Sequence, residues 1–130
     1  MRATQVALLA FVPLLLLAAA SRAEAQDAKA GETTFKRFCA VCHTVTPGQN
    51  RIGPSLYGVV GRKSGSAPGY SYSDANKNSG ITWTEEELDK YLTNPQQVVP
   101  HTKMLFAGLK NPEDRKNVIA YLKQAGEQKK

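Results

Sequence analysis

Cysteine and histidine are scarce in this chain, and charge of neither sign dominates it. The 130 residues include only two cysteines and two histidines. A structural zinc site needs about four such ligands at suitable spacing, and His101 lies far in sequence from Cys39, Cys42 and His43. The formal net charge is only +6 and the basic residues are scattered. These features argue against a zinc site and against a nucleic-acid partner.

The sequence also lacks an apolar run long enough to span a membrane. Its stretch from Val6 to Ala20 is interrupted by Pro13, whereas a spanning helix needs about 20 apolar residues. A basic residue before this stretch and Ala23-Glu24-Ala25 after it match a secretory signal peptide with an A-x-A cleavage site. We therefore expect residues 1–25 to be removed, which lowers the formal net charge from +6 to +5. Residues 26–130 would then form a single domain that is not stably inserted into a membrane.

No stretch shows the two-residue alternation of a surface strand, and the sequence contains no internal repeat. Helical patterns occur instead. Between Asp27 and Cys42, apolar or small residues recur along one stripe that includes Gly31, Phe35 and Phe38. We predict an all-α fold whose first helix covers this segment.

Two further helices are predicted toward the carboxyl end. Thr84 and Glu87 form a capping box at the start of one helix, which Asn94-Pro95 ends. Asn111 is the expected N-cap of the last helix, and Gly126 is its expected stop.

Long loops should separate these helices, at residues 44–82 and 95–110. The first of them holds seven of the ten glycines, so its backbone must turn repeatedly. Loops of this length are uncommon in a compact domain unless they serve a function or wrap something that supplies the missing core. A large apolar cofactor would supply that core in a chain this small.

Cys39-Ala40-Val41-Cys42-His43 is a C-x-x-C-H sequence, the attachment signal for c-type haem. Two thiols about one helical turn apart face the same way, so both can bond to vinyl groups on one edge of a porphyrin. His43 would then lie beneath the iron as its proximal ligand. We predict one haem c, attached through Cys39 and Cys42, with His43 bound to the iron.

Two other uses of the cysteine pair have less support. A disulfide between residues three positions apart would close a very small loop and constrain little of the unfolded chain. A disulfide oxidoreductase of the thioredoxin type belongs near a strand-helix-strand pattern, which the sequence lacks. An absorption spectrum distinguishes these uses, because only haem attachment gives a coloured protein.

Met104 is the predicted sixth ligand of the iron. It is the only methionine left once Met1 is removed with the signal peptide, and its flexible thioether could reach the face opposite His43. His101 and Lys103 are competing ligands, because each could bind iron when neutral. Coordination by histidine and methionine leaves no open position and raises the reduction potential, which favours electron transfer over oxygen chemistry.

From Gly31 to Ala125 the chain resembles the class I cytochromes c, which include the mitochondrial carrier and its soluble bacterial relatives. The similarity is densest in residues 61–65 (GRKSG), 73–83 (SDANKNSGITW) and 102–108 (TKMLFAG). The resemblance implies the small cytochrome c fold, in which the N- and C-terminal helices cross and long loops wrap one covalently bound haem. The residues that would pack at this crossing are Gly31, Phe35, Val118 and Tyr121.

The resemblance also implies roles for residues around the haem. The Pro54 carbonyl would accept a hydrogen bond from the second ring nitrogen of His43 and so fix the orientation of the ring. The residues that would hold the haem propionates are Arg62, Tyr72 and Trp83. The residues that would form a polar network on the methionine side are Asn76, Tyr91 and Thr102.

The chain departs from the mitochondrial members on the surface expected near the haem edge. Phe38 stands where they carry a lysine, and Gln96 and Gln97 stand where they carry a lysine pair. We therefore expect weaker electrostatic steering and a flatter salt dependence of association with a redox partner. His101 replaces a glycine, which affects the stiffness of the methionine loop. The basic residues expected to remain near the haem edge are Arg37, Arg51, Lys103 and Lys110.

These features together predict a soluble, monomeric, periplasmic one-electron carrier that is not an enzyme. The export signal separates it from the mitochondrial carrier. Expected partners are a quinol-cytochrome c reductase and a terminal oxidase, a photosynthetic reaction centre or a dehydrogenase. The alternative is a haem peroxidase or a peroxide or ligand sensor, in which Met104 leaves the iron and His101 supplies acid-base chemistry.

Overall fold

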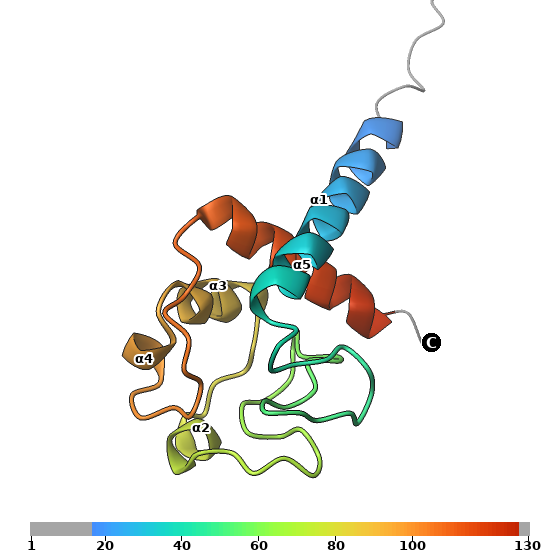
Figure 1. Cartoon of the computed structure of the whole chain (residues 1–130). Coiled ribbons are helices and arrows are strands. Elements are labelled where there is room, and N and C mark those ends of the chain that lie inside the picture. Colours follow the sequence, from blue (N-terminus) through green and yellow to red (C-terminus); the bar gives the residue numbers. More distant parts are fainter. Residues whose placement is uncertain (1–16, 128–130) are drawn as a thin grey trace, which may run out of the picture.

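A computed structural model describes the backbone of residues 17–127 and the side chains of residues 28–127 (Figure 1). The helices are α1 (Leu17–Phe38), α2 (Asp74–Asn78), α3 (Glu85–Thr93), α4 (Pro95–Val98) and α5 (Pro112–Glu127). Over this range the only β pairing is an isolated antiparallel bridge between Lys63 and Thr82. The predicted all-α fold is confirmed. None of the helices between residues 17 and 127 combines the length and the hydropathy that a membrane crossing requires.

Helix α1 starts and ends earlier than the sequence pattern predicts. It begins at Leu17, inside the predicted signal peptide. Residues 1–16 of that peptide lie outside the described residues, and its cleavage stays a prediction. At the other end, the Cys39 and Ala40 amides both donate to the Phe35 carbonyl, at 2.8 and 2.9 Å. The Cys42 amide then donates to the Cys39 carbonyl at 3.0 Å. The regular helical pairing therefore stops at Phe38, and the C-x-x-C-H segment forms tight turns instead of a continued helix.

The first and last helices, α1 and α5, cross and pack against each other (Figure 1). Gly31 is buried, and a Cβ atom placed on it would lie 1.9 Å from the backbone oxygen of Asn117 in α5. One turn further along α1, the Phe35 ring packs against Tyr121 with 5.4 Å between ring centroids. Val118 of α5 is completely buried. The predicted crossing is confirmed, and it depends on a residue without a side chain at the point of closest approach.

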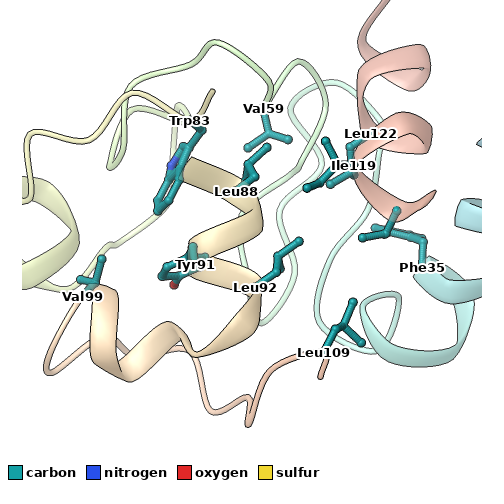
Figure 2. Close-up of a cluster of buried hydrophobic side chains, with 11 residues drawn as sticks. Phe35, Val59, Trp83, Leu88, Tyr91, Leu92, Val99, Leu109, Ile119 and Leu122 are labelled. Carbon is teal, nitrogen blue, oxygen red and sulfur yellow. The ribbon is translucent and has the colours of Figure 1, made fainter. Parts of the chain in front are cut away.

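Helix α3 completes the core. The Thr84 hydroxyl accepts a hydrogen bond from the Glu87 amide at 3.2 Å, so the predicted N-cap is present. Figure 2 shows Leu88 and Leu92 of α3 pointing toward Ile119 and Leu122 of α5. This packing fixes the position of α3 relative to the crossed helices.

The structure corrects the predicted loops and the predicted end of the last helix. Helix α2 forms where a loop was expected, because the Ser73 hydroxyl caps it by accepting the Asn76 amide at 3.1 Å. Pro95 ends α3 as predicted but also starts α4, since its fixed φ suits a first helical turn. Helix α5 continues through Gly126, which does not adopt the left-handed conformation typical of a glycine stop.

Candidate functional site

A cavity of about 440 Å³ lies between the segment that follows α1 and the segment that joins α4 to α5. These two segments lie on opposite sides of the lower half of the molecule in Figure 1. The volume is typical of a site for a small molecule or cofactor. Every site residue predicted from the sequence lines this cavity: Cys39, Cys42, His43, Pro54, Arg62, Tyr72, Asn76, Trp83, Tyr91, Thr102 and Met104.

Both cysteine thiols are free and line the cavity. Burial, with a smaller contribution from Cys42, raises the pKa of the Cys39 thiol to about 11. Redox-active thiols have a lowered pKa, because the thiolate is the reactive form. This environment disfavours the disulfide oxidoreductase considered above. Among the described residues, no three Cys, His, Asp or Glu side chains gather into a metal-binding group either.

His43 is buried and held in one orientation by its neighbours. Its Nδ1 donates to the Pro54 carbonyl at 2.7 Å, so in the neutral imidazole Nε2 carries no proton and is the nitrogen available to a metal. A Cβ atom on Gly53 would lie 2.3 Å from Cε1 of the imidazole, so only glycine leaves room for the ring. Burial lowers the pKa of His43 despite the bond to Pro54, and the positive charge of Arg62 lowers it further. The neutral imidazole is the form that binds iron.

The methionine side carries a connected polar network. The Tyr91 hydroxyl donates to Met104 Sδ at 3.4 Å and also lies 3.4 Å from the Thr102 hydroxyl. A phenol has one hydrogen, so Thr102 must be the donor in the second contact. Thr102 Oγ1 in turn accepts from Asn76 Nδ2 and from the Met104 amide, each at 3.3 Å. Burial raises the pKa of Tyr91, which keeps the phenol protonated as a donor to sulfur.

Arg62 lines the cavity and has one buried side-chain donor without a partner in the part of the chain that the structure describes. Its Nη1 and Nη2 donate to the Tyr57 and Ser55 carbonyls at 2.9 and 3.0 Å, whereas its buried Nε has no partner among the described residues. A buried donor without an acceptor is costly, so an anionic group bound in the cavity would fit here. Nearby, the Tyr72 hydroxyl accepts the Ala67 amide at 3.1 Å. These contacts fit an acidic substituent such as a haem propionate.

Trp83 forms part of the apolar wall. It is buried, and its ring lies 4.7 Å from the Tyr91 ring, centroid to centroid. This contact links the residue predicted to hold a propionate to the network on the methionine side.

Three residues that shape the site were not predicted from the sequence. Gly53 leaves space for the imidazole, Ser55 anchors Arg62, and Gln96 contacts the methionine loop. The Gly53-Pro54 dipeptide is a recognisable turn signal that points to the first of them. No sequence signal marks the other two, because Ser55 acts through its backbone carbonyl and the role of Gln96 depends on how the loop after α4 folds back on it.

The surface around the cavity keeps basic side chains in fixed positions. Of the residues that the structure describes, no aspartate or glutamate lines the cavity, whereas Lys103 does. The Arg37 guanidinium lies 4.9 Å above the Phe38 ring, and Arg51 Nη1 donates to the Ala40 carbonyl at 3.0 Å. The surrounding exposed apolar side chains are Phe38, Val41, Ile52 and Leu105.

An all-α fold that places a C-x-x-C-H segment, a fixed imidazole and a hydrogen-bonded methionine around one cavity defines a small c-type haem protein. The family model for cytochrome c matches residues 28–126. The cytochrome c2 of Blastochloris viridis is 50% identical over 117 residues, which cover 89% of this chain and 91% of that protein. The cytochrome c2 of Rhodomicrobium vannielii is 54% identical over 115 residues, or 88% and 91% of the two chains. The cytochrome c of Cochliobolus lunatus is 53% identical over 102 residues, or 78% and 94%.

The chain belongs to the cytochrome c family. It therefore binds haem c covalently through its pair of cysteines and has the electron-carrier role of that family. The cavity, the free thiols and the unpaired Arg62 donor fit this group.

Proposed function

We propose that the chain is a periplasmic one-electron carrier in which His43 and Met104 bind the iron of a single low-spin haem c. The observation that carries the proposal is that both side chains line one cavity and each is fixed by its own hydrogen bond. His43 Nδ1 donates to the Pro54 carbonyl at 2.7 Å, and Met104 Sδ accepts from Tyr91 at 3.4 Å. When bound, haem c supplies an iron that gains and loses one electron.

The protein's part in this function is to hold its own groups still. Pro54 accepts a hydrogen bond from the imidazole of His43, and Gly53 packs against the ring. Tyr91 and Thr102 hold Met104 by hydrogen bonds to its sulfur and its amide. Groups that are already in place need little rearrangement when the charge of the site changes by one unit. Arg62, which lines the same cavity, would balance the negative charge of a bound anionic group.

We propose a carrier and not a peroxidase or a sensor. Either alternative needs an open iron position and an acid-base group above it, for which His101 was the candidate. His101 is exposed and is absent from the residues that line the cavity, whereas Met104 lines it and is held by hydrogen bonds.

The location and the partners form part of the same proposal. The signal peptide predicted at residues 1–25 and the similarity to two proteins named cytochrome c2 support a periplasmic location. The proposed partners are a quinol-cytochrome c reductase and a terminal oxidase, a reaction centre or a dehydrogenase, met by a monomeric carrier.

The test is expression of the full chain in a bacterium that attaches haem c, followed by fractionation. Mass spectrometry of the periplasmic product should give a chain that starts at Gln26 and carries one haem. The ferric protein should show a low-spin spectrum with the sulfur-to-iron charge-transfer band. Met104→Ala should abolish that band and lower the midpoint potential, whereas Gln97→Ala, which removes an exposed side chain outside the cavity lining, should change neither. A colourless product, or a Met104→Ala variant with an unchanged spectrum, would refute the proposal.

A further inference from the structure

A single side-chain amide connects α4 to the backbone on both sides of Lys103. Gln96 Nε2 lies 3.3 Å from the Thr102 carbonyl oxygen and 3.3 Å from the Met104 carbonyl oxygen. An amide nitrogen carries two hydrogens, so one glutamine can donate to both carbonyls at once. The contact therefore spans the turn that presents Met104 to the cavity.

The hydrogen bonds of Met104 show why this contact matters. Its amide donates to Thr102, and its carbonyl accepts from the Phe106 amide at 3.1 Å, but both partners belong to the same loop and can move with it. Two bonds come directly from other elements, namely Tyr91 to the sulfur and Gln96 to the carbonyl. Gln96 is thus the direct tie between the Met104 backbone and a helix.

The methionine loop also contains a residue with an unfavourable backbone conformation, His101. His101 has a φ of 66° and is the only non-glycine residue with a positive φ among the described residues. L-residues rarely adopt this left-handed conformation, since the side chain crowds the backbone. The backbone strain at His101 therefore disfavours the present conformation of the loop. A hydrogen bond from another element, such as α4, helps to maintain that conformation.

We propose that Gln96 is a positioning residue that keeps Met104 over the iron and so limits how readily an external ligand displaces the methionine. This role rests on the proposed binding of iron by Met104. The glutamine is exposed and both of its bonds are longer than usual, so its effect is moderate.

The test is a titration of the ferric holoprotein with imidazole, followed through the loss of the sulfur-to-iron band. Imidazole binds only after Met104 leaves, so its apparent affinity rises with the fraction of molecules whose methionine side is open. Gln96→Ala should raise that affinity about fivefold, which corresponds to about 1 kcal/mol. Gln96→Glu has the same length and a similar helix propensity but turns an acceptor toward two carbonyls, so it should raise the affinity at least as much.

Gln97→Ala is the matched control. Gln97 is the next residue of α4, is also exposed, and its side chain makes no hydrogen bond within the described part of the chain. Its imidazole affinity should equal that of the wild type.

Three outcomes would overturn the role of Gln96. The first is an unchanged affinity in both Gln96 variants, while the wild type shows the sulfur-to-iron band; the proposed ligation by Met104 would then stand. The second is an equal rise in Gln97→Ala, which would assign the effect to α4 as a whole. The third is a wild type without the band, which would refute the ligation by Met104 itself.

Discussion

Replacing Gly31 with alanine sets two effects of opposite sign against each other at the crossing of α1 and α5. Alanine is favoured over glycine inside a helix by about 1 kcal/mol. The new Cβ atom, however, would lie 1.9 Å from the Asn117 oxygen and 2.9 Å from Tyr121 Cβ, well short of an ordinary contact of about 3.5 Å. Relief requires one helix backbone to move, because the closest atom is not on a flexible side chain.

The clash should outweigh the gain in helix propensity. Overpacking of a buried site costs about 1–3 kcal/mol, and the backbone position of the clash places Gly31→Ala at the upper end. The net loss should therefore be about 2 kcal/mol. Movement of the helices would also weaken the contact between Phe35 and Tyr121.

The assay is guanidinium unfolding of the holoprotein, followed by circular dichroism. Thr33→Ala is the control, because Thr33 is exposed on α1 and its hydroxyl reaches only the Lys29 carbonyl of the same helix, at 3.5 Å. Its free energy of unfolding should change by less than about 0.5 kcal/mol. A Gly31→Ala variant as stable as the wild type would show that the crossing tolerates a side chain, contrary to the reasoning above.

Three further predictions concern the site and its surface. Gly53→Ala should reduce the free energy of unfolding by about 2 kcal/mol and change the haem spectrum, since its Cβ would lie 2.3 Å from the His43 ring; a normal spectrum with normal unfolding contradicts this. His101→Gly should raise the free energy of unfolding by about 0.5 kcal/mol, because the relief of backbone strain at a φ of 66° exceeds the added entropy of the unfolded chain. Denaturant unfolding measures this change, and a variant less stable than the wild type would contradict the prediction. Phe38→Lys should make association with an acidic redox partner fall more steeply with salt, and an equal slope in stopped-flow mixing would refute the proposed weak steering.

The sequence predicted the parts of the fold whose signals are local. The capping box at Thr84 marked the start of α3, and the spacing of Cys39, Cys42 and His43 marked the haem attachment segment. Helix α2 was not predicted, because five residues are too few to show the hydrophobic periodicity of a helix. Ser73 is nevertheless an ordinary N-cap residue.

The parts that could not be predicted depend on tertiary contacts. The position of the Arg62 guanidinium depends on how the loop before it folds back, because Nη1 and Nη2 donate to the Tyr57 and Ser55 carbonyls, whereas Nε has no partner among the described residues. The tie from Gln96 depends on the place where α4 meets the methionine loop, and no pattern within either segment reveals it. Cys39, Cys42, His43 and Met104 were predicted from the residues themselves, whereas the other predicted site residues came from resemblance to a family; all of them line the cavity.

The contact between α1 and α5 joins the beginning of the described domain to its end, and the haem-binding segments lie on the chain between these joined ends. Opening of the methionine loop does not break this closure, because the close approach at Gly31 and the ring contact between Phe35 and Tyr121 involve no residue that lines the cavity. The site can thus fluctuate as a local unit of low stability while the rest of the molecule stays folded. Ligand exchange at the iron and global unfolding are accordingly separate events, each with its own free energy.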